Sequence, residues 1–500
     1  MKKVTVFLVL LISGVISNVE AQTDSIAKAT ERFKSALQII NYTYVHSVDN
    51  QMLVGEAIGA MLEKLDPHSH YYSKEEYLLE QYSLSDKKVD IGIEFILIQG
   101  EYRVWHIDTS KISHTIGVQI GDRLLSINDV GCQHFSSMNS LQNFLINHSD
   151  KLIHLRLENS QSNEQVSISL HPAYVEQYGI PYFSILQSGV GYVKIEQFKK
   201  NTAKYFHKIL QDFKKQNVNS LILDLRSNQG GFFQAAIDIA DEFLEENQVI
   251  VFTQGESKRK EVFRSTKNAL FKRGKLVIMV DHNSASASEI LAGAIQDHGR
   301  GFIVGERTYG KALVQRDYFL EDSSVLRLSV AKYYTPAGKS IQRDYQQEKI
   351  AETPTESLKE SSSRGGIKPD KIIKIKKSKL LSEIVERRLS KLFLLDEWDF
   401  VCKYIVVPLT QYDQLQQFAV RKEIYNYFNH YLTQQNDFIG DKEFLQNRNE
   451  ILTMMKRDII SIYCNGELSK RYNVATDSLI QTVLQLLEDN AVFGEFGITY

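Results

Sequence analysis

The sequence predicts a multidomain chain in which a small β-rich module precedes an α/β layer, with helical regions at both ends. Three observations predict this fold class. Strand-like and helical runs alternate over residues 190–345, short strand-like runs crowd together over 85–172, and helical spacing dominates the two ends of the chain. Alternating strands and helices are typical of a mainly parallel sheet that is covered by helices.

The composition is that of an ordinary globular protein. Of the 500 residues, 43% are hydrophobic and 24% are charged, which argues against a disordered or collagen-like chain. The net charge of −2 gives no overall basic surface, so we expect no nucleic-acid partner. Cys132, Cys402 and Cys464 are odd in number and far apart, which disfavours a zinc ribbon or a disulfide framework. We expect neither a metal nor a cofactor.

Residues 1–21 have the pattern of a secretory signal peptide. Lys2 and Lys3 precede an apolar run over residues 4–16, and Val19-Glu20-Ala21 supplies small residues for cleavage. The alternative is a membrane anchor, but this run is shorter than the ~20 residues that span a bilayer. We therefore expect an exported protein, periplasmic or extracellular, with no stable membrane insertion after the signal is removed.

The next two regions differ in their periodicity. Residues 22–84 show helical spacing up to Leu65-Asp66-Pro67-His68-Ser69, where the proline predicts the end of a helix. Residues 85–172 instead carry five short strand-like runs and a single helical stretch at 137–147. The runs lie at 91–98, 102–107, 123–128, 152–157 and 165–170.

Residues 173–375 form the predicted α/β layer. Strands are expected at 191–195, 220–225, 276–280 and 302–304, and helices at 203–215, 235–243 and 287–297. The run at 220–225 is wholly apolar apart from Ser220 and Asp224, as in a strand that is buried on both faces. Residues 346–364 have the polar composition of a solvated loop, and residues 376–500 are polar and helical.

Residues 281–289, with the sequence DHNSASASE, follow a predicted strand and open a helix. A turn of this kind exposes small side chains at the carboxyl edge of a sheet and presents unpaired backbone N–H groups. A serine placed there can attack a carbonyl while these N–H groups stabilise the oxyanion. The alternative is a serine-rich cap that only starts the helix.

Two further stretches lead to the same edge of the sheet. In residues 305–315, Lys311 lies between Gly310 and Ala312 ahead of an apolar strand, where burial would favour the neutral amine that a general base needs. In residues 224–231, the pair Gly230-Gly231 permits close backbone approach. The alternatives are an exposed loop lysine and a structural strand–helix connection.

Together the three stretches resemble the carboxyl-terminal processing peptidases, also called tail-specific proteases. The motifs that carry the resemblance are DLRSNQGG at 224–231, SASASEI at 284–290, GERTYGK at 305–311 and YTPAG at 334–338. They occur in the order of the family, over about two thirds of the chain. The resemblance implies a crotonase-like α/β core and serine endopeptidase activity.

The same resemblance assigns a role to each site residue. Ser286 matches the nucleophile, Lys311 the general base, and Gln315 the residue that orients the lysine. The oxyanion hole would consist of the N–H of Ala287 and one from Gly230-Gly231. Where the family usually has glycine after the lysine, this chain has Ala312, which leaves the lysine in place.

Residues 85–172 resemble a PDZ domain inserted before the core. Ile91-Gly92-Ile93-Glu94 matches the carboxylate-binding loop and the first strand of the groove. PDZ grooves add a chain terminus as an extra strand and hold its carboxylate with loop N–H groups. The expected partners are therefore polypeptide substrates that are bound by their C-termini.

Some alternatives remain open from the sequence. A histidine base, with His68, His70 or His282, would replace the Ser-Lys pair. A catalytically silent PDZ scaffold that binds polypeptide tails, or a hydrolase of small acyl esters, would replace the peptidase. The sequence also leaves open whether the chain forms a homo-oligomer.

Overall fold

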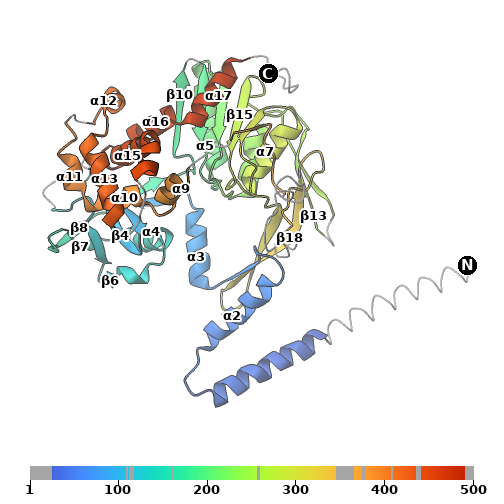
Figure 1. Cartoon of the computed structure of the whole chain (residues 1–500). Helices are drawn as coiled ribbons and strands as arrows, with labels where there is room; N and C mark the ends of the chain where they lie inside the picture. Colours follow the sequence, from blue (N-terminus) through green and yellow to red (C-terminus); the bar gives the residue numbers. More distant parts are fainter. Residues whose placement is uncertain are drawn as a thin grey trace, which may run out of the picture. The chain divides into compact units, whose positions relative to one another are not determined.

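The computed structural model describes ten stretches of the chain and one single residue. They are residues 25–108, 111, 117–159, 161–187, 189–255, 259–344, 365–373, 378–406, 409–434, 441–464 and 466–489. The predicted signal peptide and the predicted loop at 346–364 lie outside the described residues. The chain divides into two compact units, Met1–Lys74 with Arg316–Ser329, and Glu75–Gln315 with Val330–Tyr500 (Figure 1).

The first unit contains the predicted N-terminal helices. Residues 25–43 are helical, and α2 (Asn50–Glu63) begins where the Asp49 carboxylate accepts the N–H groups of two helical residues. The helix ends before Pro67, in a turn where Asp66 accepts the N–H groups of His68 and Ser69 at 2.8 Å. The short strand β1 (His70–Tyr72) then pairs with the start of β18 (Val325–Tyr334).

The β-rich module of the second unit has its own core. Its sheet is antiparallel in the order β3 (Ile93–Ile98), β4 (Glu101–Ile107), β5 (Arg123–Ile127), β7 (Ile153–Glu158) and β8 (Gln165–Leu170), with β6 (Val130–Gly131) on β5. The helix α4 (Met138–Asn147) buries Leu141 and Leu145 in the core of this module. Each predicted strand is present to within two residues at either end.

The predicted α/β layer, residues 173–375, contains a six-stranded sheet. Its order is β10 (Tyr182–Gln187), β11 (Val190–Lys194), β12 (Ser220–Asp224), β15 (Lys275–Val280), β16 (Phe302–Gly305) and β19 (Lys371–Ile372). The β10–β11 pair is antiparallel and the other four pairs are parallel, in agreement with the predicted mainly parallel sheet. All five residues of β12 are buried, as its apolar sequence predicts.

Different helices cover the two faces of this sheet. Side chains such as Leu221 and Leu223 pack with α5 (Thr202–Lys215), α6 (Phe233–Asp241) and α7 (Ala287–Asp297). The alternate residue Ile222 instead packs with α16 (Gly466–Ala475) and α17 (Ser478–Glu488). Because successive side chains of a strand point to opposite faces, the sheet is buried on both sides. The hairpin β13 (Val249–Gln254) and β14 (Glu261–Arg264) pairs with the end of β18.

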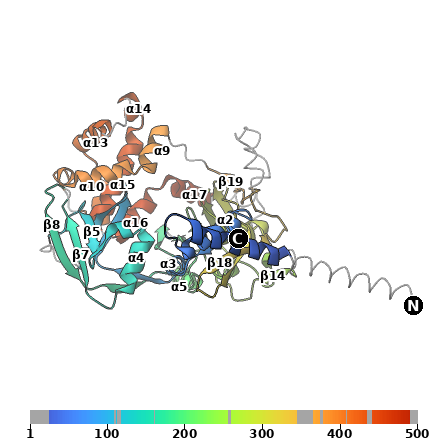
Figure 2. The same cartoon turned by 90° about the horizontal axis from the view of Figure 1, so that it is seen from below.

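The C-terminal helices have a second attachment, on the β-rich module. Ile98 and Trp105 of β3 and β4 share one hydrophobic core with several of these helices, and Arg103 forms an ion pair of 2.5 Å with Asp396. Figures 1 and 2 show the ribbons of these helices beside the strands of the module. The helices are α9 (Lys379–Glu386), α10 (Leu389–Asp396), α11 (Trp398–Cys402), α12 (Tyr412–Gln417), α13 (Lys422–Gln434), α14 (Asp441–Gln446) and α15 (Arg448–Tyr463). The C-terminal region therefore contacts both the module and the α/β core, which its polar sequence did not predict.

Candidate active site

The three motif stretches meet at one edge of the core sheet. They follow the ends of β12, β15 and β16, which are parallel neighbours, so the turns come together as the sequence predicted. The approach is close at Gly230, where an added Cβ would lie only 2.9 Å from Cβ of Ser286. Gly230 has φ of +107°, so this position requires a residue without a side chain for two reasons.

Ser286 is the accessible member of the serine cluster. It is the N-cap of α7 with φ of 55° and ψ of −112°, a strained conformation for a residue other than glycine, and it is partly exposed. Ser284 and Ser288 are fully buried. Their hydroxyls donate at 2.9 Å to the carbonyl oxygens of Leu225 and Asn228. Both flanking serines are therefore structural, and Ser286 is left as the candidate nucleophile.

Glu289 connects the serine turn to the lysine loop. Its buried carboxylate accepts the N–H of Ser286 at 2.9 Å and the N–H of Lys311 at 2.9 Å through the same oxygen. The other oxygen accepts the Thr308 hydroxyl at 2.6 Å and the Gly310 N–H at 2.7 Å. Burial raises the pKa of Glu289 to about 7, while these four hydrogen bonds favour the carboxylate form.

Lys311 and Gln315 are in contact, as the resemblance implied. The Nζ of Lys311 donates to Oε1 of Gln315 at 3.0 Å. The hydroxyl of Tyr333 donates to the carbonyl oxygen of Ser286 at 3.0 Å and also contacts the carbonyl oxygen of Lys311. Tyr333 and Glu289 thus hold the same two backbone segments together from two directions.

The predicted oxyanion donors differ in their present bonding. Ala287 is the first residue of α7, where N–H groups have no acceptor within the helix. The N–H of Gly230 instead donates to Oδ1 of Asn228 at 2.8 Å. Asn228 is fully buried, and its Nδ2 donates to the carbonyl oxygen of Ile195 at 3.0 Å. The Gly230 amide is therefore engaged by a neighbouring side chain in this structure.

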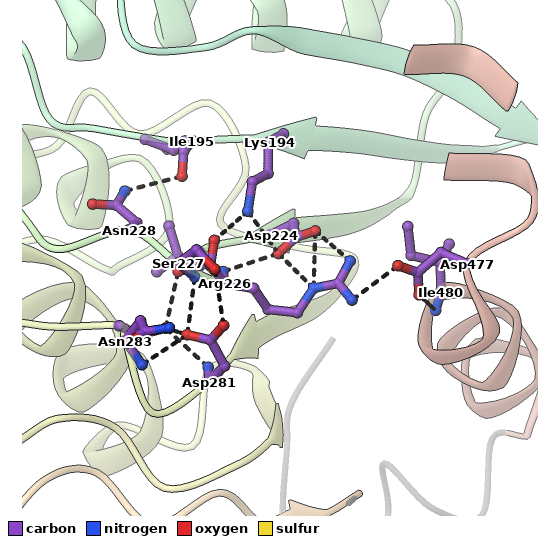
Figure 3. A network of polar contacts seen from close by, with 12 residues as sticks. Lys194, Ile195, Asp224, Arg226, Ser227, Asn228, Asp281, Asn283, Asp477 and Ile480 are labelled. Atoms are coloured by element: carbon purple, nitrogen blue, oxygen red, sulfur yellow. Dashed lines mark hydrogen bonds and ion pairs between the residues drawn. The ribbon is translucent and has the colours of Figure 1, made fainter. Parts of the chain in front are cut away.

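An ion-pair network lies at the start of the glycine turn (Figure 3). Arg226 donates through Nε and Nη2 to the buried carboxylate of Asp224, which also accepts the Tyr192 hydroxyl at 2.8 Å. Burial alone would raise the pKa of Asp224. The hydrogen bonds from Arg226 and the charge of Lys194 outweigh this effect and hold the pKa below its usual value. The Nη1 of Arg226 donates to Asp477 at 3.0 Å, so the network reaches the C-terminal region.

Asp281 holds the same turn from the side of the serine motif. Its carboxylate accepts the N–H of Ser227 at 2.9 Å and the Ser227 hydroxyl at 3.2 Å. Ser227 has φ of 60°, so the carboxylate stabilises a conformation that serine rarely adopts. The turn that leads to Gly230 is therefore fixed at both ends before any substrate binds.

The histidine alternatives gain no support. The Nδ1 of His282 lies 3.1 Å from Glu306, and the His282 side chain is 72% exposed. An exposed imidazole paired with a surface carboxylate is poorly placed to act on a partly buried serine. His68 and His70 belong to the first unit of the chain.

The predicted carboxylate loop of the β-rich module already contains a carboxylate. Gly92 has φ of +75°, and its N–H donates to Oδ1 of Asp90 at 2.7 Å. Asp90 also forms an ion pair with Lys111 at 2.6 Å. Burial raises the pKa of Asp90, but the contacts with Lys111 and Gly92 outweigh burial and hold the pKa below its usual value. Ile91 and Ile93 are buried in the module and Glu94 is exposed. β3 is the first strand of its sheet order, with β4 as its hydrogen-bonded neighbour.

The sequence is similar to that of known proteins over the same region. The model "Peptidase family S41" matches residues 189–351, and "Activating protease CtpB N-terminal domain" matches residues 12–76. The carboxyl-terminal-processing protease of Picosynechococcus is 30% identical over 301 residues, which cover 58% of this chain and 70% of the relative. The chain belongs to peptidase family S41. The family that the motifs predicted is thereby confirmed.

Two more processing proteases match over similar lengths. The carboxy-terminal-processing protease of Bartonella bacilliformis is 28% identical over 341 residues, covering 67% of this chain and 77% of the relative. The carboxy-terminal processing protease CtpB of Bacillus subtilis is 28% identical over 328 residues, covering 65% of this chain and 68% of the relative. Similarity to these S41 peptidases therefore extends well beyond the serine and lysine motifs.

Four residues of this candidate site were not assigned from the sequence. They are Glu289, Asn228, Tyr333 and Asp477. A signal existed for Glu289, because Ser-x-x-Glu at the start of a helix is the pattern in which the glutamate bonds back to the N-cap N–H. Asp477 lies 251 residues from Arg226 in the sequence, so no local pattern could have paired them.

Proposed function

We propose that this S41 peptidase is a serine endopeptidase with a Ser286–Lys311 dyad. The observation that carries the proposal is the position of Glu289, whose single Oε2 binds the backbone N–H of both residues. A buried carboxylate shared in this way couples the nucleophile turn to the base loop. Gln315 then orients the amine of Lys311.

In the proposed mechanism, neutral Lys311 accepts the proton of Ser286 as its oxygen attacks the scissile carbonyl carbon. The tetrahedral oxyanion is stabilised by backbone N–H groups at Ala287 and the Gly230-Gly231 turn. The protonated lysine then gives its proton to the leaving amine as the C–N bond breaks. A water molecule, deprotonated by the lysine, hydrolyses the acyl-serine ester and restores the enzyme.

Use of Gly230 in this step requires a local change. Its N–H now donates to Asn228, so the amide must turn from that side chain toward the substrate carbonyl. Glycine at a positive φ makes such a rotation sterically permissible. Without it, Ala287 and Gly231 would supply the donors.

We further propose that the β-rich module is a PDZ domain that selects polypeptide C-termini. β3 stands at the end of its sheet order, which suits the addition of a substrate strand. The named relatives are carboxyl-terminal processing proteases, which is consistent with a substrate bound by its tail. The alternative, a silent scaffold, would bind such tails without cutting them.

Export is part of the same proposal. It rests on the signal-peptide pattern of residues 1–21, with its lysines, apolar run and small residues. Among the described residues, no helix has both the length and the apolar character that crossing a membrane requires.

The test is cleavage of an end-labelled polypeptide by three full-length proteins. The wild type should cut it, and Ser286→Ala should be inactive while remaining folded. Ser288→Ala is the matched control, because it removes one buried hydroxyl bond at a cost of about 1 kcal/mol in stability and leaves the nucleophile. Cleavage by Ser286→Ala at the wild-type rate would contradict the assignment, and tail binding without cleavage by the wild type would favour the scaffold.

A further inference from the structure

A cavity of about 860 Å³ lies beside the glycine turn and has no part in the mechanism above. One wall is α5, and the others come from residues 81–87 and 174–178, which flank the β-rich module in the sequence. Aromatic side chains line it, and the rings of Tyr178 and Tyr205 are 4.7 Å apart. The cavity therefore offers flat apolar surfaces within a polar rim.

The charge of this cavity is positive. Lys200, Lys204 and Lys208 line it at intervals of four residues, and Lys87 faces them from the other wall. All four lysines are exposed, and none forms an ion pair with any residue in the described part of the chain. On α5 this spacing places Lys204 and Lys208 on one helical face.

Two acidic residues of the lining, Asp86 and Glu176, offset these lysines only in part. Asp86 accepts a hydrogen bond of 2.7 Å from Nδ2 of Asn201, and Glu176 accepts the hydroxyl of Tyr178. Both carboxylates keep their charge in these bonds, so the four lysines exceed the two carboxylates and the lining is positive overall. A row of lysines on a surface helix is commonly only a solvated face, but these line a cavity together with aromatic rings.

The position of the cavity links it to catalysis. Phe198 forms a bridge with Gly231 and accepts the N–H of Phe232 at 2.7 Å, which brings the start of α5 against the glycine turn. Phe232 lines the cavity and directly follows Gly231. A chain lying in the cavity would therefore pass close to the turn that touches Ser286.

We propose that this cavity binds an acidic segment of the polypeptide substrate near the bond that is cleaved. Glutamate or aspartate side chains would pair with Lys200, Lys204 and Lys208, and the extended backbone would lie on the aromatic rings. The inference rests on the proposed peptidase function and adds a substrate class to it. It gives the enzyme a preference for acidic sequence that is separate from recognition of a C-terminal carboxylate.

The test measures binding without cleavage, using the full chain with Ser286→Ala. Two fluorescent peptides are compared, one with a run of glutamates and one with glutamines at the same places, both amidated so that a carboxylate groove is not engaged. We expect the glutamate peptide to bind about tenfold more tightly, since each exposed ion pair contributes up to ~1 kcal/mol. The preference should decline as salt is raised.

Charge reversal on α5 supplies the matched control. Lys204→Glu/Lys208→Glu should abolish the preference for glutamate, and Lys204→Gln/Lys208→Gln should reduce it. Lys214→Glu/Lys215→Glu makes the same charge change on the same helix outside the cavity, and it should retain the preference. Thermal melting of each variant establishes that it is folded.

Three results would overturn the inference. They are equal affinity for the two peptides, equal loss in the two reversal variants, and tighter binding of a single-stranded oligonucleotide that displaces the peptide. Wild-type cleavage of both peptides without preference would refute binding of an acidic segment in the cavity, and it would leave the proposed peptidase activity supported. Preferential binding of the glutamate peptide, with no cleavage of any peptide by the wild type, would support the acidic binding site and refute the proposed peptidase activity.

Discussion

Two backbone amides that were predicted to bind substrate, those of Gly230 and Gly92, are both already engaged by side chains of the chain itself. The N–H of Gly230 donates to the amide oxygen of Asn228 at 2.8 Å, and both of these residues are buried although Gln229 and Gly231 beside them are exposed. The N–H of Gly92 donates to the carboxylate of Asp90 at 2.7 Å, in a partly exposed loop. Both glycines are buried, so the two sites differ in the accepting side chain, which is neutral and buried at Asn228 but charged and partly exposed at Asp90.

The difference suggests that the two accepting side chains have different effects on ligand binding. Asn228 is neutral and is itself bonded to Ile195, so it holds the turn at Ser286 in shape. Asp90 carries the same charged group as a polypeptide C-terminus, so under the proposed PDZ function it would compete with the substrate for the Gly92 N–H. We infer that the Gly230 amide must rotate away from Asn228 before it can bind substrate. In the module, an incoming carboxylate must displace the Asp90 side chain from the Gly92 N–H.

The largest effect is expected at the base. Lys311→Ala should lower kcat by about 10³-fold or more, because nucleophile and base act as one unit. Lys311→Arg should fail as well, because a guanidinium stays protonated at working pH. Steady-state cleavage of a labelled peptide measures both variants, and substantial activity in Lys311→Arg would point to another base.

Glu289→Gln should lower kcat by about 10²-fold while the protein remains folded. A glutamine has one acceptor oxygen, and its NH₂ group would face two of the N–H and O–H donors that the carboxylate now satisfies. The lysine loop would lose its register against Ser286. A kcat within threefold of the wild type would show that Glu289 does not couple Ser286 to the loop of Lys311.

The pH dependence follows from the pKa of Glu289, about 7 in the fold against 4.5 for an ordinary glutamate. Activity should rise through pH 7 as the carboxylate ionises, and Glu289→Gln should lack this inflection. Because the folded state binds the extra proton between these two values, the contribution of this group to stability is greatest below pH 4.5 and is lost as pH rises through about 7. An inflection that persists unchanged in Glu289→Gln would assign it to another group.

On the module side, Asp90→Ala should tighten binding of peptides with a free C-terminus by about tenfold. The substitution frees the Gly92 N–H and Lys111 for the incoming carboxylate, and a hydrogen bond to a charged group contributes ~1.5–3 kcal/mol. Peptides with an amidated C-terminus are the control and should not respond. Weaker binding of the free acid would mean that Asp90 shapes the loop rather than occupying it.

The smallest effect is expected at the end of the ion-pair network. Asp477→Asn removes the charge that faces Arg226 but keeps an oxygen for the N–H groups of Leu479 and Ile480, so the helix cap survives. We expect about a threefold loss in kcat with little change in KM or melting temperature. Asp477→Ala also loses the cap and should melt lower. A loss of stability in Asp477→Asn, or an unchanged kcat, would show that the ion pair between Asp477 and Arg226 does not contribute to catalysis.

Local patterns predicted much of this fold. The predicted strand at 165–170 coincides with β8, where burial alternates with the period of a strand. The predicted helix at 287–297 coincides with α7, although burial there is continuous from Ala287 to Ile295 and shows no helical period. The serine and lysine stretches were also placed correctly at one edge of a sheet, since parallel strands end together.

Contacts between distant segments could not be predicted in the same way. The packing of Trp105 with the C-terminal helices joins segments some 300 residues apart, and it makes the β-rich module a less separable unit than its sequence implied. Asn228 and Asp90 were missed for another reason. A side chain that satisfies a nearby amide leaves no periodic signature, and only the backbone conformation reveals it.

The central claim is tested most directly by covalent labelling of the nucleophile. A fluorophosphonate forms a stable ester with an activated serine, and peptide mass spectrometry identifies the modified residue. The account predicts one adduct, on Ser286, whose rate of formation falls steeply in Lys311→Ala and in Glu289→Gln. An adduct on Ser284 or Ser288, or labelling of Ser286 at the same rate in all three proteins, would contradict a Ser286–Lys311 dyad held together by Glu289.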